Sequence, residues 1–280
     1  MLLKQRLRDH LSQIVRERDP YLAQEGHLFV QTYIRQELEQ WGIVQTHEFM
    51  IQSRMHTNLT LHIPAEAGRQ QQPPILVAAH YDAVPGTQGA DDNATGVAAL
   101  LELARSFASD PARYPLQLVA FDLEEYGLLG SDRYAAHLVK QNQQLRLMLS
   151  LEMLGYCDQT PGSQKYPPGF KYFYPDRGNF IGLIGNLPTF LDMRHLSRSI
   201  KQAGVPAQWL PAGMKGQLLT MTRLSDHAPF WDRGYPAIMV TDTAFLRNPH
   251  YHKPSDRLGT LDLDFFTGVC QGLIDGIRCL

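Results

Sequence analysis

Three short apolar runs, each followed by acidic or imidazole residues and separated from the next by a helical pattern, constrain the fold of this chain most strongly. They are ILVAA at residues 75–79, LQLVAFD at 116–122 and LRLMLSL at 145–151. Apolar runs of this length are typical of strands buried on both faces of a parallel sheet. Helical patterns at residues 96–107 and 131–140 separate the runs. This alternation predicts a mostly parallel sheet covered by helices on both faces.

The remaining segments fit one α/β domain over residues 1–280. Residues 1–42 contain apolar residues at helical spacing and predict two helices, the second covering about 27–41 before Gly42. Alternating stretches at 44–51 and 58–63 predict a hairpin, and further strands are expected at 180–183 and 237–240. Helices are expected at 187–203 and 261–280. The fold class is therefore a doubly wound, mostly parallel mixed sheet within a three-layer sandwich.

Composition and charge disfavour several kinds of partner. Of 280 residues, 44% are hydrophobic and the formal net charge is only −2, which disfavours binding to nucleic acid or anionic membranes. No uncharged apolar run approaches the roughly 20 residues needed to span a bilayer, and the N-terminal segment carries charges throughout, unlike a secretory signal. The three cysteines, at positions 157, 270 and 279, suit neither a metal site nor a disulfide framework. We therefore expect a cytoplasmic protein, with its oligomeric state open.

Two long segments carry no regular pattern. They cover residues 156–179, which are rich in aromatic residues, and residues 211–223, which contain glycine and methionine. Loops of this length inside a compact domain usually have a function. We expect them to border an active site, with tolerated surface insertions as the alternative.

Acidic and imidazole side chains follow the three apolar runs. His80 and Asp82 come just after the first run, Glu124 and Glu125 after the second, and Glu152 directly after the third. Ligands of open α/β sheets bind beyond the carboxyl ends of the strands. One such residue alone would be interpreted as a solvated or capping loop residue. Three sets at one edge of the sheet indicate a functional site.

The chemistry of these residues suits zinc. Imidazole and carboxylate groups are zinc ligands, and catalytic zinc sites leave a position open for water. Asp82, two residues after His80, suits a carboxylate that orients a ligating imidazole. Glu124 and Glu125 would repel each other if both were buried. A cation bound to one of them resolves the repulsion and leaves the other as a proton acceptor.

Four separate blocks of sequence carry a resemblance to a known family. They are HYDAVPGTQGADDNATGVAALLELAR, LVAFDLEEYGLLGS, LSLEMLGY and NPHYHKPSD, in this order, over roughly residues 80–256. In these blocks the chain resembles metallopeptidase family twenty-eight, which includes bacterial leucyl aminopeptidases, glutamate carboxypeptidases and, more distantly, glutaminyl cyclases. The resemblance implies a doubly wound α/β fold with two zinc ions that share a bridging carboxylate and a water molecule.

The resemblance also implies a role for individual residues. Glu124 matches the general base, and the metal ligands are expected to be His80, Asp92, Glu125, Glu152 and His252. The bridging aspartate of the family lies four residues before a glycine, which selects Asp92 and leaves Asp91 as the alternative. Glu152 stands where the family usually has aspartate. His252 fits an H-x-x-x-D pattern that ends at Asp256, whereas the competing His250 does not.

Three further positions are weaker candidates. Tyr251 occupies a place where some relatives hold a phenol against the developing oxyanion, and a packed tyrosine is the alternative. The block SDHAPFWDRGYPAIMV also resembles the family, and its Asp226 and His227 are candidates for lining the substrate pocket. A helix cap formed by Ser225 and Asp226 is the competing interpretation.

These assignments predict a zinc-dependent aminopeptidase that cleaves the N-terminal bond of peptide or aminoacyl substrates, using a metal-activated water and Glu124. One alternative is a single-zinc aminoacyltransferase similar to glutaminyl cyclases. Another is a zinc carboxypeptidase of the same family. A receptor-like or scaffolding member of the family that kept the fold but lost its metals is disfavoured, because all five ligand positions and Glu124 are present. A serine hydrolase is disfavoured, because the sequence has no Gly-x-Ser-x-Gly motif.

Overall fold

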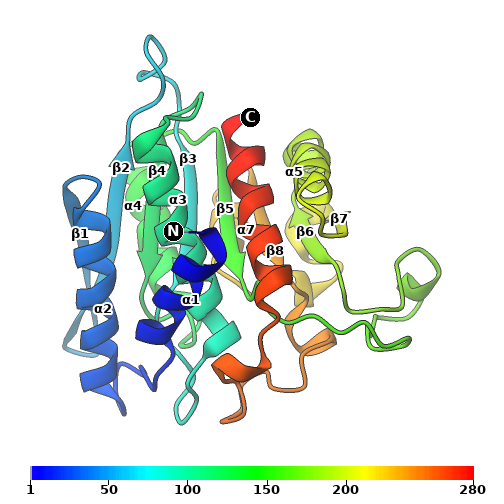
Figure 1. Ribbon diagram of the computed structural model, residues 1–280. Helices are drawn as coiled ribbons and strands as arrows, with labels where there is room; N and C mark the ends of the chain where they lie inside the picture. Colours follow the sequence, from blue (N-terminus) through cyan, green and yellow to red (C-terminus); the bar gives the residue numbers. More distant parts are fainter. Residues whose placement is uncertain (1) are drawn as a thin grey trace.

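The computed structural model describes residues 2–280 and contains a mixed sheet between two layers of helices (Figure 1). Its eight strands lie in the order β1-β2-β4-β3-β5-β8-β6-β7. Their bounds are β1 Val44–Ile51, β2 Arg54–Ile63, β3 Ile75–His80, β4 Leu116–Phe121, β5 Leu147–Glu152, β6 Ile181–Gly185, β7 Ala207–Pro211 and β8 Ala237–Thr241.

Parallel pairing dominates the centre of the sheet. β3 pairs in parallel with β4 on one side and β5 on the other, and β5 pairs in parallel with β8. Antiparallel pairing joins β1 to β2, β2 to β4 and β6 to β8, while β6 and β7 are parallel. The expected α/β fold with a mostly parallel mixed sheet is confirmed. β3, β4 and β5 consequently end at the same edge, the lower one in Figure 1.

Helices cover both faces of the sheet. They are α1 Leu3–Ile14, α2 Gln24–Glu39, α3 Gly96–Ser109, α4 Leu129–Lys140, α5 Phe190–Gln202, α6 Ala228–Asp232 and α7 Leu263–Arg278. One core joins α1, α2, α3, α5 and α7 to one face, and a second core joins α4 and α6 to the other. Successive strand residues alternate between the faces, so Val77 enters the first core and Ala78 the second.

The structure differs from the sequence-based expectations at several places. The segment 187–203 begins with a 3-10 turn at Leu187–Thr189, and α5 starts only at Phe190. Pro188 has no N–H to donate, which suits a turn rather than a helix interior. β7 and the short α6 were not expected. β7 ends at Pro211, so the expected loop 211–223 begins inside a strand and then forms two 3-10 turns.

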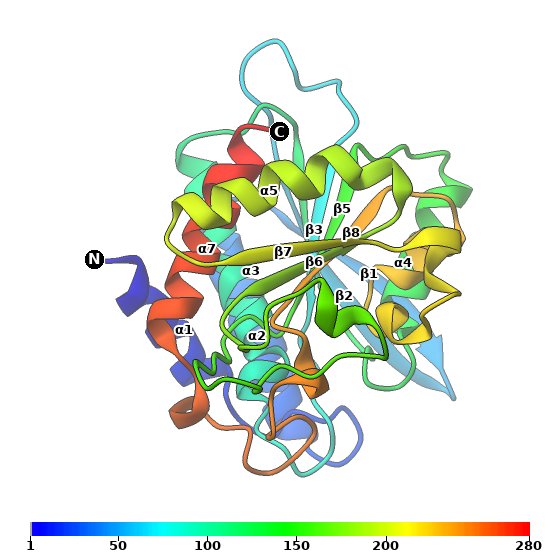
Figure 2. The same cartoon turned by 90° about the vertical axis from the view of Figure 1, so that its right-hand side faces the viewer.

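β7 forms one edge of the sheet, with α5 lying across it (Figure 2). Beyond this edge the loop 156–179 extends away from the sheet, at the lower right of Figure 1. A 3-10 turn at Phe170–Tyr172 interrupts it. None of the helices within residues 2–280 has both the length and the apolar character needed to cross a membrane.

Candidate metal centre and substrate pocket

The ends of the central strands bring a histidine and two acids to one point. His80 is the last residue of β3 and Glu152 is the last residue of β5. Asp92 lies in an irregular helical turn just before α3. The Nε2 atom of His80 is 3.3 Å from Asp92 Oδ1 and 3.7 Å from Glu152 Oε1. These three side chains form one group whose potential ligand atoms all lie within 4.8 Å of each other.

A second group of the same kind shares Asp92. It consists of Asp92, Glu125 from the turn after β4, and His252 from the loop before α7. His252 Nε2 lies 3.2 Å from Asp92 Oδ2 and 3.4 Å from Glu125 Oε2. The two oxygens of Asp92 therefore face two different histidines. A carboxylate that bridges two cations needs this orientation.

The hydrogen bonding at this cluster fits a metal. Both ring nitrogens of His80 and one carboxylate oxygen of Glu125 are buried without a hydrogen-bond partner among residues 2–280. Buried polar atoms are almost always paired in folded proteins. Imidazole nitrogens and carboxylate oxygens are the ligands that zinc accepts. The side chains that are present therefore fit the two-zinc centre implied by the sequence.

The charges of the cluster lead to the same conclusion. Burial raises the pKa values of Glu124 and Glu125 well above their ordinary range, and the charge of Asp92 adds to the effect at Glu125. Burial lowers the pKa of His80, but the carboxylates of Glu124 and Glu152 outweigh it and raise that pKa well above the ordinary value. Acids held this close repel one another, and a divalent cation among them relieves the repulsion.

The neighbouring Asp91 is oriented differently from Asp92. Its Oδ1 accepts a hydrogen bond from the backbone N–H of Gly155 at 2.8 Å, and its Oδ2 accepts one from Asn248 at 2.7 Å. Asp256 accepts hydrogen bonds from the backbone N–H groups of both aspartates. The carboxylate of Asp91 thus connects neighbouring loops by hydrogen bonds. Of the two aspartates, only Asp92 directs its carboxylate toward the histidines.

His250, the alternative to His252, lies outside both groups. Its Nδ1 is 3.0 Å from Ser255 Oγ, and its ring lies edge-on to Tyr156. The geometry favours His252 as the histidine that completes the cluster.

Asp82 positions the residues around it. Its two oxygens accept hydrogen bonds from the backbone N–H groups of Glu124 and Glu125, both at 3.1 Å. Its Oδ1 also lies 3.4 Å from Nδ1 of His80. One buried carboxylate therefore connects the end of β3 to the turn that carries both glutamates.

The backbone next to the cluster adopts conformations that are uncommon for residues other than glycine. Leu123, Met153 and His252 have φ values of 57°, 50° and 56°. Leu123 immediately precedes Glu124, and Met153 immediately follows Glu152. Left-handed backbone at non-glycine residues is often found at functional sites, where the surrounding structure enforces it.

The other predicted residues have different surroundings. Asp226 is fully buried, has no hydrogen-bond partner among residues 2–280, and burial raises its pKa to about 7. His227 Nε2 lies 2.8 Å from the carbonyl oxygen of Thr222, and its ring packs edge-on against Trp231. Burial lowers the pKa of His227 to about 4, so the ring is neutral. Among the described residues, the lining of the pocket below includes neither Asp226 nor His227.

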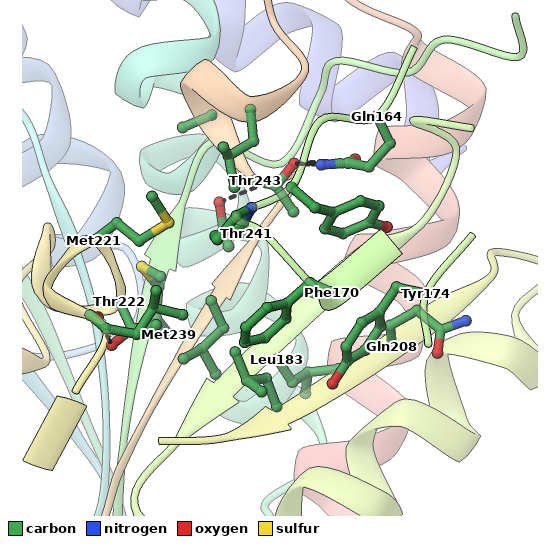
Figure 3. Close-up of a pocket in the computed structure, with 18 of the residues that line it drawn as sticks. Gln164, Phe170, Tyr174, Leu183, Gln208, Met221, Thr222, Met239, Thr241 and Thr243 are labelled. Atoms are coloured by element: carbon green, nitrogen blue, oxygen red, sulfur yellow. Dashed lines mark hydrogen bonds between the residues drawn. The ribbon is translucent and has the colours of Figure 1, made fainter. Parts of the chain in front are cut away.

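Figure 3 shows an apolar pocket. Its lining includes Glu152 of the acidic cluster. It encloses about 880 Å³ when the open mouth and the solvent space within it are counted. Its floor comes from β6 and β8, with Leu183 and Met239. Its walls come from the two long loops, with Phe170 from 156–179 and Met221 from 211–223. Within the described chain, the only charged residue in this lining is Glu152.

Tyr251 connects the pocket to the candidate ligand cluster. It lines the pocket, and its ring stacks on that of His252 with 3.7 Å between ring centroids. Burial raises the pKa of its phenol well above the ordinary value, so the hydroxyl stays protonated near neutral pH. A protonated phenol at this position can donate a hydrogen bond to a substrate oxygen.

Several residues of the site were not predicted from the sequence. Leu183 and Met239 belong to strands whose apolar pattern indicates only a core. Ser225 donates a hydrogen bond to Glu152 Oε2 at 2.7 Å, and its place directly before Asp226 was the available signal. Arg18 lies fully buried beneath the cluster, and nothing in its local sequence separates it from the neighbouring Arg16.

Residues 58–274 match the sequence profile of "Peptidase family M28". Over 227 residues the chain is 37% identical to the uncharacterized protein YfbL of Escherichia coli (strain K12), covering 76% of this chain and 69% of YfbL. It is 42% identical over 82 residues to aminopeptidase YwaD of Bacillus subtilis (strain 168), covering 29% of this chain and 18% of YwaD. The similarity to YwaD is thus confined to less than a fifth of that enzyme.

Solved structures share the fold at low sequence identity. The LapA aminopeptidase of Legionella pneumophila aligns with a TM-score of 0.73 at 19% identity, covering 99% of this chain and 71% of LapA. A glutaminyl cyclase of Tannerella forsythia aligns with a TM-score of 0.71 at 18% identity, covering 98% of both chains. BSAP, a zinc aminopeptidase of Bacillus subtilis, gives 0.57 at 22% identity, covering 81% of this chain and 50% of BSAP.

Proposed function

The chain belongs to peptidase family M28, and from that premise we propose that it is a two-zinc aminopeptidase for peptides with an apolar first residue. The observation that carries the proposal is the pair of ligand groups that share Asp92. One group adds His80 and Glu152, and the other adds Glu125 and His252. The fold shared with LapA and BSAP agrees with this function.

In the proposed reaction, Glu124 moves the proton. When bound, zinc supplies Lewis-acid chemistry that polarises the scissile carbonyl and makes water more acidic. Glu124 accepts the proton of the attacking water on its carboxylate and returns it to the leaving amine. Burial raises the pKa of Glu124, which suits a group that both takes and gives a proton near neutral pH. Asp82 holds the backbone of Glu124 beside the cluster.

Glu152 and Tyr251 link binding to chemistry. Glu152 belongs both to the acidic cluster and to the pocket lining, so its carboxylate attracts the N-terminal amine of a substrate whose first side chain fills the pocket. Attack is then confined to the first peptide bond. The Tyr251 hydroxyl donates a hydrogen bond to the oxyanion that forms at the scissile carbonyl.

The lining of the pocket supports an apolar side chain as its occupant. Leucine, methionine, phenylalanine, tyrosine and tryptophan side chains form most of it. Within the described chain, no lysine or arginine contributes to it. A carboxypeptidase needs a cation to hold the C-terminal carboxylate of its substrate, so this lining favours an aminopeptidase.

We also propose that the protein acts in the cytoplasm. The three cysteines are unpaired thiols, and Cys270 is buried in the core. Unpaired thiols suit a reducing compartment, where disulfides are rare. The small net charge gives no support for a nucleic-acid or membrane partner.

Metal content combined with a substrate panel tests the function. Purified protein should contain two zinc ions per chain, and chelation should abolish hydrolysis of leucyl, methionyl and phenylalanyl amides. Added Zn²⁺ or Co²⁺ should restore it. N-acetylated versions of the same substrates should not be cleaved, because the free amine is part of the recognition. Full activity of the metal-free protein would contradict the proposal.

The same experiment separates the glutaminyl-cyclase alternative, whose relative from Tannerella forsythia matches this chain over nearly its whole length. One zinc ion per chain, together with cyclisation of peptides that begin with glutamine, would support a cyclase. Two zinc ions with hydrolysis of leucyl amides support the aminopeptidase.

A further inference from the structure

Arg18 lies at the base of the metal centre, although it comes from a part of the chain that the family profile does not cover. It follows α1, and the profile begins at residue 58. Its side chain is 0% exposed. A guanidinium is rarely buried without strong compensation. Its partners therefore indicate what it does.

All the hydrogen bonds of Arg18 go to backbone carbonyl oxygens, most of them in the segment between His80 and Asp92. Its Nε donates to Tyr81 at 2.8 Å, and its Nη1 donates to Gln88 at 2.6 Å. Its Nη2 donates to Gly89 at 2.8 Å and to Asp92 at 3.3 Å, and Nη1 also reaches Arg16 at 3.3 Å. The rigid fork of one guanidinium thus joins both ends of this segment.

The charge of Arg18 is balanced by the acids of the metal centre. Its hydrogen bonds reach carbonyl groups and no carboxylate in the described chain. Burial lowers the pKa of its guanidinium, while the nearby carboxylates of Asp92, Asp256 and Asp82 raise it. The cation and the acidic cluster therefore stabilise each other in the absence of metal.

Gly89, on the other side of this contact, leaves the space that the guanidinium occupies. Gly89 has a φ of 54°, and a Cβ atom there would lie 2.2 Å from the carbonyl oxygen of Asp92 and 2.7 Å from Nη2 of Arg18. Only a residue without a side chain lets the guanidinium approach this closely. The guanidinium of Arg18 and the backbone at Gly89 are thus complementary in shape, although the two residues are far apart in the sequence.

We propose that Arg18 is a positioning residue that preforms the zinc centre by holding the 81–92 segment, so that His80 and Asp92 stand at ligand spacing before metal binds. This inference rests on the proposed zinc function. It also gives the N-terminal helical part, residues 1–42, a role in the site rather than in packing alone.

Zinc titration of the metal-free protein by calorimetry tests the proposal, with Arg18→Lys as the main variant. Lysine keeps the positive charge, but its single ammonium cannot reach carbonyls spread along the segment as the guanidinium fork does. We expect Arg18→Lys to remain folded and to bind zinc about 10–100-fold more weakly, the usual loss when a residue that orients metal ligands is changed. The visible spectrum of the Co²⁺-loaded variant should also change, because the spectrum reports ligand geometry.

Arg18→Met separates positioning from charge. A cation that acted only through its charge would repel zinc, so its removal would tighten binding and Arg18→Lys would bind like the wild type. That pair of results would overturn the proposal. Weaker binding in both variants supports it.

Arg146→Met is the matched control. Arg146 forms a two-bond ion pair with Asp192 and lies just before β5, at the end of that strand opposite to Glu152. We expect this variant to lose stability without losing zinc affinity. An equal loss of affinity in the Arg146 and Arg18 variants would reduce the role of Arg18 to general stability and overturn the proposal.

Gly89→Ala covers the case in which the Arg18 variants do not fold, because it disturbs the same contact from the other side. Weaker zinc binding by folded Gly89→Ala supports the proposal, and wild-type affinity overturns it. If the wild-type chain itself binds no zinc, the proposed function fails together with this inference. If the wild type binds two ions and Arg18→Lys binds them as tightly, only the positioning role fails.

Discussion

The acidic cluster and the apolar pocket are adjacent but are built in different ways. The cluster lies at the ends of the central strands. Its backbone is held by N–H groups that donate to Asp82 and Asp256 and by a carbonyl that accepts from Arg18. The pocket lies toward the β7 edge, and its walls come largely from two long loops. A rigid cluster suits chemistry that depends on ligand spacing, while loops allow the fit to a side chain to vary. Substitutions in the two regions should therefore have different kinetic effects.

The largest effect is expected at the residue shared by the two ligand groups. Asp92→Asn replaces one of the oxygens that face His80 and His252 by an amide nitrogen. We expect binding of two zinc ions to collapse, which metal analysis and calorimetry would detect. Asp91→Asn is the matched control, because Asp91 ties loops and does not face the histidines. Two intact sites in the Asp92 variant would assign the bridge to Asp91.

The next effect is expected at the proposed base. Glu124→Gln should retain both zinc ions while kcat falls by about 10²–10⁴-fold, the usual contribution of general acid–base catalysis. Glu125→Gln should instead lose zinc affinity, since Glu125 is grouped with His252 and the shared Asp92, whereas Glu124 is grouped only with His80 and Glu125. Steady-state kinetics with metal analysis of both variants distinguishes the roles. The reverse pattern would exchange the assignments of the two glutamates.

A smaller effect of a different kind is expected in the pocket. Phe170→Ala removes part of a wall without touching the cluster. KM for leucyl and phenylalanyl amides should rise about tenfold, within the range for one lost apolar contact, while kcat changes little. Phe173→Ala is the control, because Phe173 is 83% exposed and does not line the pocket. A large fall in kcat for Phe170→Ala would remove the distinction between the two regions.

The smallest effect concerns an ion-pair network beside the cluster. Asp122 directly follows β4, and its two oxygens lie 2.8 Å from His27 and 3.0 Å from His56. Burial lowers the pKa of His27, but Asp122 raises it above the ordinary value. Burial likewise raises the pKa of Asp122, but the two histidines lower it to about 2. His27 and Asp122 are therefore both charged at mildly acidic pH.

His27→Gln tests this network through stability. The contribution of Asp122 is present above its ordinary pKa of 3.8 and is lost as pH falls toward 2. The contribution of His27 is present below 6.5 and is lost as pH rises through its raised pKa. We expect a loss of about 1 kcal/mol in the free energy of unfolding at pH 5.5 and a smaller one at pH 9, measured with urea. Equal losses at both pH values would contradict this.

The fold was largely predictable from the sequence, because apolar runs and helical spacing dominate its core. The strand at residues 44–51 was expected with its observed bounds. β7 was missed because AQWLP is short, contains proline and forms an edge that is only partly buried. α7 begins at Leu263, later than expected, because the side chain of Asp262 caps it.

The candidate site was predictable only in part. His80 and Glu152 end buried strands, so the position of the strands alone brings them to one edge. The choice of Asp92 over Asp91 required the motif of the family, since both stand in the same turn. His252 lies in a loop that no periodicity predicts. Arg18 could not be found, because its role depends on contacts with carbonyl groups that local sequence does not specify.

The spread of the ligands along the chain has a consequence for when metal can enter. His80 and His252 flank more than half of the sequence, and β8, the last central strand, is made shortly before His252. At about 5–20 residues per second, a ribosome takes on the order of ten seconds or more to make the part between the two histidines. During that time the growing chain presents acids and a histidine without their full geometry. In the proposed enzyme, the full ligand set therefore exists only after residue 252 has been made, so any selection among metals by that set comes late in synthesis.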